Sequence, residues 1–178
     1  NVDHGSLPGC AGDIKEELGM NDFEFGMLGS VVYGGLTLGA GVASGVYQNS
    51  HWAKPTLLIT LFMNSVFIFV FAKSHSFYLD AFLRFCLGFF QVFSCIYLPV
   101  WADVYANEKQ KSSWVTILLL SSPLGIVGGY TLTSFMVRYA SWQYSFYVQA
   151  AGIMVSVVFY FFLPSKYLNV DYTVKTKK

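Results

Sequence analysis

One stretch of the sequence combines the length of a membrane-crossing helix with a charge in its interior. Residues 83–105 read LRFCLGFFQVFSCIYLPVWADVY and include Arg84 and Gln91. A charged side chain in the middle of the hydrocarbon region costs about 2.5–3.5 kcal/mol even on the most lenient insertion scales. Arg84 is therefore expected to face other helices or a hydrated cavity. Gln91, two helical turns later, and Asp80, one turn earlier, lie on the same face, so Asp80 can pair with Arg84.

Composition indicates that the whole chain belongs in a membrane. Of its 178 residues, 54% are hydrophobic, 19% are aromatic and only 12% are charged, and the mean hydropathy is +0.49. A soluble domain carries about 25% charged residues, so the excess apolar surface requires lipid. The net charge of +1 excludes nucleic acid as an expected partner. We predict an integral, multi-pass protein whose partner is the lipid bilayer of an unspecified membrane.

Five apolar segments follow one another along the chain. Each has the length needed to cross the roughly 30 Å hydrocarbon core as a helix. We predict an all-α membrane protein in which residues 23–163 form a five-span transmembrane helix bundle. The spans are expected at about residues 25–47, 55–72, 77–102, 114–137 and 142–163.

The two ends of the chain are more polar than this bundle. Residues 1–22 cannot span a membrane by themselves, and we expect them to form the end of a truncated first transmembrane helix and an extracytosolic loop. Within them, residues 13–18 can form one or two amphipathic helical turns. Residues 164–178 are predicted to be a basic cytosolic tail or the start of a central loop.

Small residues recur every four positions in two of the spans. Gly35, Gly39 and Ala43 do so in the first span. Gly41 and Gly45 form a second pair there. In lipid, such a row forms a groove that lets another helix approach closely, and a proline inside a span permits a bend. Helix packing and bending are therefore the roles expected of Gly35, Gly39, Gly88, Pro123, Gly125 and Gly129.

The segments between the spans differ in charge on the two sides of the membrane. Residues 48–54, residues 106–113 and the tail after residue 163 fall on one side, and the positive-inside rule makes this side cytosolic. It carries Lys54, Lys109, Lys111, Lys166, Lys175, Lys177 and Lys178, whereas the opposite side carries Lys15, Lys73, Arg138 and the acidic Asp13, Glu16, Glu17, Asp22 and Glu24. Trp114 and Trp142 fall at span ends, where interfacial aromatic residues are favoured, and we assign them no binding role.

No enzymatic motif is present in the sequence. Cys10, Cys86 and Cys95 lack the spacing of zinc ligands and are interpreted as packing residues. His51 and His75 lie in loops and are expected to face water. A nucleophile elbow, a phosphate loop and a paired-histidine zinc motif are all missing. We therefore predict no enzyme activity, no catalytic residue, no metal and no cofactor.

The segment that follows the first span resembles a transporter signature. In the major facilitator superfamily, the loop between the second and third helices reads Gly, three residues, Asp, Arg, one residue, Gly and two basic residues. Here Gly45 and Lys54 keep the two ends of that pattern and Asn49 stands at the acidic position. The resemblance implies a cytosolic gate motif of Gly45, Asn49 and Lys54, together with Asp103 at the cytosolic end of its span.

The chain is most similar to the Spinster-like branch of that superfamily. The first helix of this branch ends in Asp-Arg, and its fourth helix reads Arg, three residues, Gly, two residues, Glu, then Pro and Ala-Asp. The matching residues here are Asp3, His4, Arg84, Gly88, Gln91, Pro99, Ala102 and Asp103. Two of them depart from the pattern, because His4 replaces Arg and Gln91 replaces Glu.

This resemblance implies the amino-terminal half of a 12-helix transporter that works by alternating access. It makes Asp3, His4, Arg84 and Gln91 the residues of a substrate and coupling cavity. The expected partners are a small-molecule substrate and the missing carboxy-terminal half, and the expected function is secondary active or facilitative transport of an anionic or amphipathic, lipid-like solute. Gln91 cannot titrate, so either Asp3 or His4 carries a proton or the transporter has no proton coupling.

Alternative interpretations stand beside this one. Arg84 can pair with Asp80 and extend toward water near the outer interface, and Gln91 can serve only as a hydrogen-bonding group between helices. The degenerate loop and Gln91 also fit a transport-inactive structural or assembly subunit derived from a transporter. A half-size carrier that acts as a dimer is a third possibility.

Overall fold

The computed structural model describes residues 1–48 and 52–170, and within them it contains helices and no strand. Five helices, α3 to α7, are long and apolar enough to cross a membrane. These findings confirm the predicted all-α transmembrane helix bundle. The helices are α1 (Val2–Gly9), α2 (Ala11–Leu18), α3 (Asp22–Val46), α4 (Ala53–Phe71), α5 (Phe77–Tyr105), α6 (Glu108–Tyr139), α7 (Trp142–Phe162) and α8 (Ser165–Leu168).

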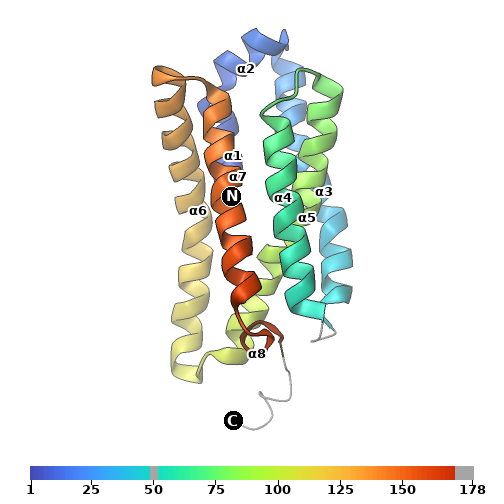
Figure 1. Ribbon diagram of the computed structural model, residues 1–178, viewed down its shortest axis with the longest axis vertical. Coiled ribbons are helices and arrows are strands. Elements are labelled where there is room, and N and C mark those ends of the chain that lie inside the picture. Colours follow the sequence, from blue (N-terminus) through green and yellow to red (C-terminus); the bar gives the residue numbers. More distant parts are fainter. Residues whose placement is uncertain (49–51, 171–178) are drawn as a thin grey trace.

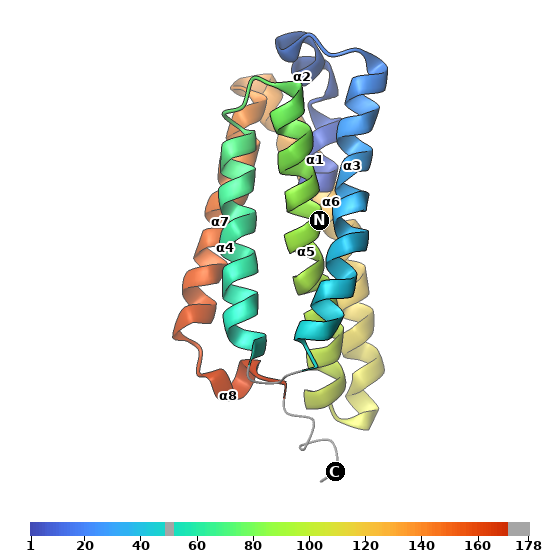
Figure 2. The same ribbon diagram turned by 90° about the vertical axis from the view of Figure 1, so that its right-hand side faces the viewer.

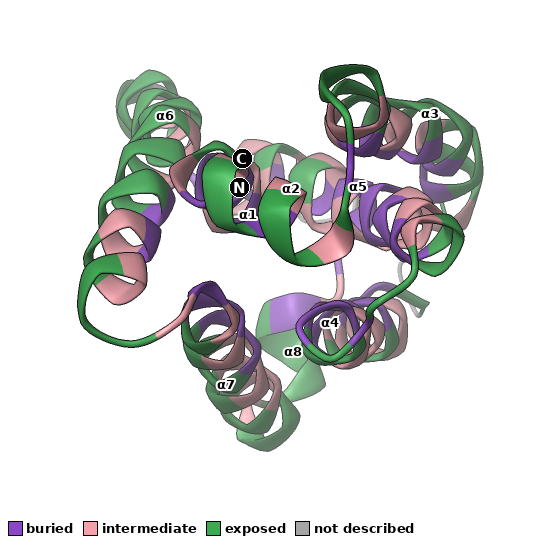
Figure 3. Cartoon of the chain, turned by 90° about the horizontal axis from the view of Figure 1, so that it is seen from above, coloured by how far each residue is buried: buried purple, intermediate pink, exposed green. Residues whose placement is uncertain are grey.

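The five long helices run along a common axis, and short helices lie at the two ends of the bundle (Figures 1 and 2). α5 packs against α3 and α4, α4 also packs against α7, and α1 packs against α6. Seen from above, α1 lies between α6 and α5 (Figure 3). The amino terminus is at mid-height of the bundle in both side views (Figures 1 and 2). The first residues of the chain therefore lie partway along the long helices.

The two ends of the bundle carry different charges, as predicted from the charged residues between the spans. α8, the end of α3, the start of α4 and the connection from α5 to α6 gather at one end (Figure 1), which we call the lysine-rich end (Lys54, Lys109, Lys111 and Lys166). α2 and the turns before α5 and α7 gather at the other, which we call the acidic end (Asp13, Glu16, Glu17, Asp22 and Glu24). The cytosolic location of the lysine-rich end stays a prediction from the positive-inside rule.

α2 covers the acidic end and then reverses into α3. Gly19 ends α2 with a φ of 62°, a left-handed conformation that glycine adopts without a steric penalty. Asn21 and Glu24 then form a capping box, in which each side chain accepts a 2.9 Å hydrogen bond from the backbone N–H of the other residue. The expected amphipathic turn at residues 13–18 is thus a complete helix, α2.

The largest difference from the predicted boundaries is at α6. Residues 106–113 were expected to form a loop because they are hydrophilic, but α6 already begins at Glu108. Its first turns extend past the apolar part of the span toward the lysine-rich end, so polarity there marks the edge of the hydrocarbon region and not the end of the helix. α5 likewise continues through Pro99 to Tyr105, and α6 continues through Pro123.

Glycines bring two pairs of helices into backbone contact. A Cβ added to Gly35 of α3 would overlap the carbonyl oxygen of Phe85, and one added to Gly88 of α5 would overlap that of Val32. Gly39 adds to the same contact, since its Cβ would lie 2.5 Å from Phe89 O.

The contact between α1 and α6 is built in the same way. A Cβ added to Gly129 would overlap the carbonyl oxygen of Val2, and one added to Gly5 would overlap that of Ile126. Gly125 makes only an ordinary contact, with its added Cβ 3.6 Å from Asn1 Cβ. The second pair in α3 behaves differently, because Gly41 and Gly45 have no described atom within 4 Å of an added Cβ.

Candidate functional site

A cluster of four polar side chains lies between α1 and α5, deep inside the bundle. Gln91 Nε2 donates a hydrogen bond of 3.2 Å to Asp3 Oδ1, and His4 Nε2 lies 3.1 Å from Gln91 Oε1. Because the carboxylate can only accept, it orients the amide so that Oε1 points to His4 and His4 Nε2 must donate. Arg84 Nη1 lies 3.7 Å from Asp3 Oδ2, an ion pair without hydrogen-bond geometry.

Helical spacing explains why these residues face inward. In α1, Asp3, Ser6 and Leu7 are buried, as is Cys10 one turn later, so one face of the helix turns toward the bundle. In α5, Arg84 and Gln91 lie on the face that meets α1. The glycine contacts hold α1 against α6, and the side chains of Asp3 and His4 reach α5 from there.

Arg84 is enclosed by protein. Its side chain is only 1% exposed, and its guanidinium carbon lies 4.4 Å from the ring centre of Phe71 and 5.8 Å from that of Phe146. Aromatic faces stabilise a cation that has been removed from water. The alternative in which Arg84 extends to water near the outer interface is therefore wrong. Its ion pair is formed with Asp3 of α1.

A cavity of about 820 Å³ lies in the bundle on the side of Asp3 and Gln91 that faces the lysine-rich end. Its wall is mainly apolar and comes from α1 and all five long helices. Asp3 and Gln91 belong to this wall, whereas His4 and Arg84 do not. His4 instead lies beside Tyr33 of α3, with ring centres 5.8 Å apart. Of the four cavity residues expected from the sequence, all meet in one cluster and two reach the cavity.

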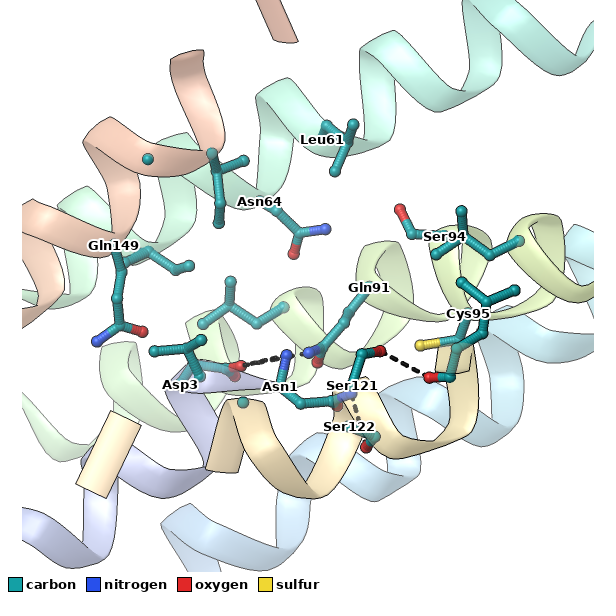
Figure 4. A pocket seen from close by; sticks show the side chains of 18 of the residues that line it. Asn1, Asp3, Leu61, Asn64, Gln91, Ser94, Cys95, Ser121, Ser122 and Gln149 are labelled. Carbon is teal, nitrogen blue, oxygen red and sulfur yellow. Dashed lines mark hydrogen bonds and ion pairs between the residues drawn. The ribbon is translucent and has the colours of Figure 1, made fainter. Parts of the chain in front are cut away.

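Several further polar residues of the cavity wall were missed by sequence analysis. Asn64 of α4 and Gln149 of α7 are buried polar residues in the cavity wall, on the side opposite Ser122 of α6 (Figure 4). Gln149 Nε2 also donates a hydrogen bond of 2.8 Å to Ser6 Oγ, and this bond connects α7 to α1. The available signal was a single amide inside an otherwise apolar span, since such groups turn away from lipid.

The residues of the expected gate motif have separate partners at the lysine-rich end. Lys54 Nζ donates to the carbonyl oxygens of Leu163, at 2.5 Å, and Phe161, at 3.1 Å. Asp103 forms an ion pair with Lys111 of α6. Gly45 faces open space within the described chain, and Asn49 lies outside the described residues. Lys54 therefore connects α4 to the end of α7.

At the acidic end, Glu17 of α2 connects three parts of the chain. Its carboxylate accepts hydrogen bonds from Trp142 Nε1, at 2.6 Å, and Gln143 Nε2, at 3.0 and 3.1 Å. His75 Nδ1 lies 3.8 Å away, and this imidazole is largely exposed, as expected of a loop residue. Trp142 is only 2% exposed. Trp142 is the first residue of α7, as expected of a span end, but its indole is buried in the bundle and donates to Glu17.

The three cysteines have clearly different surroundings. Cys95 lines the cavity, Cys86 is half-buried elsewhere on α5, and Cys10 is 1% exposed with its thiol directed at Ser6 O, 3.1 Å away. None of the three cysteines, all of which the structure describes, forms a disulfide. The described part of the chain also contains no group of three His, Cys, Asp or Glu residues that could bind a metal ion.

A cysteine reacts with a maleimide as its thiolate, which attacks the reagent and forms readily only where water is present, so Cys95 reports on whether the cavity is hydrated. In variants that keep a single cysteine, we expect a small uncharged maleimide to modify Cys95 roughly ten times faster than Cys86 or Cys10, measured by mass spectrometry of protein in nanodiscs. Cys86 is the matched control, since it lies on the same helix but outside the cavity wall. Equal rates at positions 86 and 95 would contradict a hydrated cavity.

Comparisons with known proteins agree with this architecture. The family model described as Major Facilitator Superfamily matches residues 6–175. The chain is also 22% identical over 148 residues to "Probable sphingolipid transporter spinster homolog 1" of Arabidopsis thaliana. That alignment covers 83% of this chain but 30% of the relative, so the chain spans less than a third of the relative's length. The family match extends over almost all of the chain, from α1 to the residues after α8, and the chain therefore belongs to the Major Facilitator Superfamily.

Proposed function

We propose that this chain is the amino-terminal half of a membrane transporter that moves a small organic solute by alternating access. The observation that carries the proposal is the buried cluster of Asp3, His4, Arg84 and Gln91 beside a cavity inside the bundle. Ionisable groups in a membrane interior are costly and mark solute or ion pathways when they face a cavity. The carboxy-terminal half of the same transporter is the expected partner.

The chemistry of the site favours an anionic, amphipathic solute. Arg84 is the cation of the cluster, and a guanidinium forms strong charge-assisted bonds with carboxylate or phosphate. Arg84 lies behind Asp3, outside the cavity wall, so an anion in the cavity would reach it only by displacing Asp3 from their long ion pair of 3.7 Å. The mainly apolar cavity wall suits a hydrocarbon chain next to that headgroup. A lysolipid or a sphingoid phosphate combines the two, in agreement with the name of the Arabidopsis relative.

Asp3 and His4 are the candidate proton carriers. Gln91 takes the position of a carboxylate but does not titrate, and its amide connects Asp3 to His4 through two hydrogen bonds. Protonation of His4 would place a cation next to the ion pair of Asp3 and Arg84, and His is the side chain that changes charge near neutral pH. Proton-coupled transport would therefore depend on His4 or Asp3, and a transporter without proton coupling would need neither to titrate.

Uptake into proteoliposomes that contain the full-length protein tests the proposal. The probes are a fluorescent sphingoid phosphate, a lysophospholipid and an uncharged lipid of the same chain length. We expect flux of the anionic probes, a loss of at least roughly tenfold per folded protein in Arg84→Ala, and a changed pH profile in Gln91→Glu. Arg138→Ala is the matched control, because Arg138 is an exposed arginine at the end of α6.

The second candidate function is a transport-inactive assembly subunit. It is favoured by the degenerate loop motif, in which Lys54 is held by the carbonyl oxygens of Phe161 and Leu163, whereas the acid Asp103 pairs with Lys111. Absence of flux for every probe in the parent protein, with no change in either variant, would replace the transporter proposal by this one.

A further inference from the structure

A second buried carboxylate lies next to Arg84, on the side away from the cavity. Asp80 precedes Arg84 by one turn of α5, and its residue is 1% exposed. The Ser74 hydroxyl hydrogen-bonds to its carboxylate, but the Oδ1 atom is buried and has no hydrogen-bond partner in the described part of the chain. An ionised carboxylate in a bundle interior needs a cation or donors nearby, because burial removes its hydration.

Arg84 has unused donors that match this carboxylate. A guanidinium carries five N–H groups in a rigid fork. Within the described residues, Nε and Nη2 are buried without a hydrogen-bond partner, and Nη1 reaches only the 3.7 Å ion pair with Asp3. The cation is therefore held mainly by the faces of Phe71 and Phe146, which do not fix it to one carboxylate.

The spacing allows Arg84 to reach either carboxylate. Residues four apart on a helix face are neighbours, so a rotation of the Arg84 side chain directs its fork along α5 toward Asp80. Asp3, on α1, lies on the cavity side of the same guanidinium. One cation therefore has two buried carboxylates within reach, Asp3 on α1 and Asp80 on its own helix.

We propose that Asp80 is a second partner of Arg84, to which the guanidinium moves when it leaves Asp3. In this second arrangement Asp3 is released toward the cavity and Arg84 stays paired inside the bundle. Asp80 is then a positioning residue that acts through Arg84. The proposal concerns the pairing itself and holds whether or not the protein transports a solute.

Unfolding of the full-length protein in lipid nanodiscs tests this proposal without any substrate. If Arg84 can use either carboxylate, Asp3→Asn and Asp80→Asn each leave one partner and lower the unfolding temperature modestly. The double variant leaves no partner, so its loss should exceed the sum of the two single losses, by roughly twofold. Asp3→Asn with Asp80→Glu should behave like Asp3→Asn alone, because the carboxylate is retained.

Two controls separate shared pairing from a merely structural role of Asp80. Asp13 of α2 is exposed, so Asp13→Asn combined with Asp3→Asn should give additive losses. Adding Arg84→Met to the double variant removes the unpaired cation and should raise the unfolding temperature, or restore folding if the double variant does not fold. Additive losses for Asp3 and Asp80, or a triple variant no more stable than the double, would overturn the proposal.

Discussion

Gly35→Ala is expected to disrupt the bundle, although it adds a single methyl group. The new Cβ would overlap the carbonyl oxygen of Phe85 and lie 2.8 Å from Phe89 N, and both are backbone atoms of α5 that cannot rotate away. α3 and α5 would have to separate, which lengthens the contacts around Gly39 and Gly88 as well. We expect a loss of about 3 kcal/mol in the free energy of unfolding, at the upper end for overpacking.

The same helix provides the control for this prediction. Gly41→Ala introduces the same methyl group where no described atom lies within 4 Å, and alanine favours a helix over glycine by roughly 0.8–1 kcal/mol. Thermal unfolding and size-exclusion chromatography of both variants in the same detergent measure the difference. Equal stability of Gly35→Ala and Gly41→Ala would show that the close approach of α3 and α5 is not required.

The positions of the spanning helices follow from the sequence, because a long apolar run has few alternatives in a membrane. The ends of those helices do not follow as well. α6 begins at Glu108, in the hydrophilic segment 106–113, since backbone hydrogen bonding continues after the chain has left the hydrocarbon region. The hydropathy of a segment indicates whether its side chains favour lipid or water, but not whether its backbone is helical. It therefore predicts the middle of a spanning helix better than the ends.

The candidate site follows from the sequence in part. The cost of a buried charge predicts that Arg84 faces inward, and burial of Arg84 beside Phe71 agrees with this. Its partner could not be deduced from spacing. Asp80 lies at the helical distance for a local pair, yet the ion pair goes to Asp3 of another helix. Which residues meet between helices depends on the rotation of each helix and on glycine contacts such as that of Gly129 with Val2.

The amide side chains of the cavity wall could also be predicted from the sequence only in part. Asn64 and Gln149 stand alone in apolar spans, so their inward direction could have been expected, but their common cavity could not. Trp142 was assigned to the interface by its position at a span end. In the structure its indole N–H is accepted by Glu17, a residue 125 positions earlier. Partners so distant in sequence are fixed by packing, for which the sequence contains no local signal.

Replacement of Arg84 by alanine is expected to have the largest effect on stability among single changes in the cluster. The variant would remove the guanidinium that lies beside Asp3 and Asp80, and both of these residues are at most 5% exposed. Removal of one partner from a buried ion pair costs about 3–5 kcal/mol, because the remaining charge is uncompensated. The truncated side chain also gives up its contact with the Phe71 ring.

The pH dependence of this loss distinguishes charge from packing. In Arg84→Ala, protonation neutralises the two stranded carboxylates, so the unfolding temperature should recover in part as the pH is lowered from 8 to 5. The control Arg138→Ala removes an exposed arginine and should stay within about 0.5 kcal/mol of the parent at every pH. A loss in Arg84→Ala that is the same at all pH values would assign the effect to packing against Phe71 and Phe146. Recovery at low pH would instead mean that the charge of Arg84 allows the two carboxylates to remain ionised inside the bundle. Under that condition, an anionic solute can compete with Asp3 for the guanidinium.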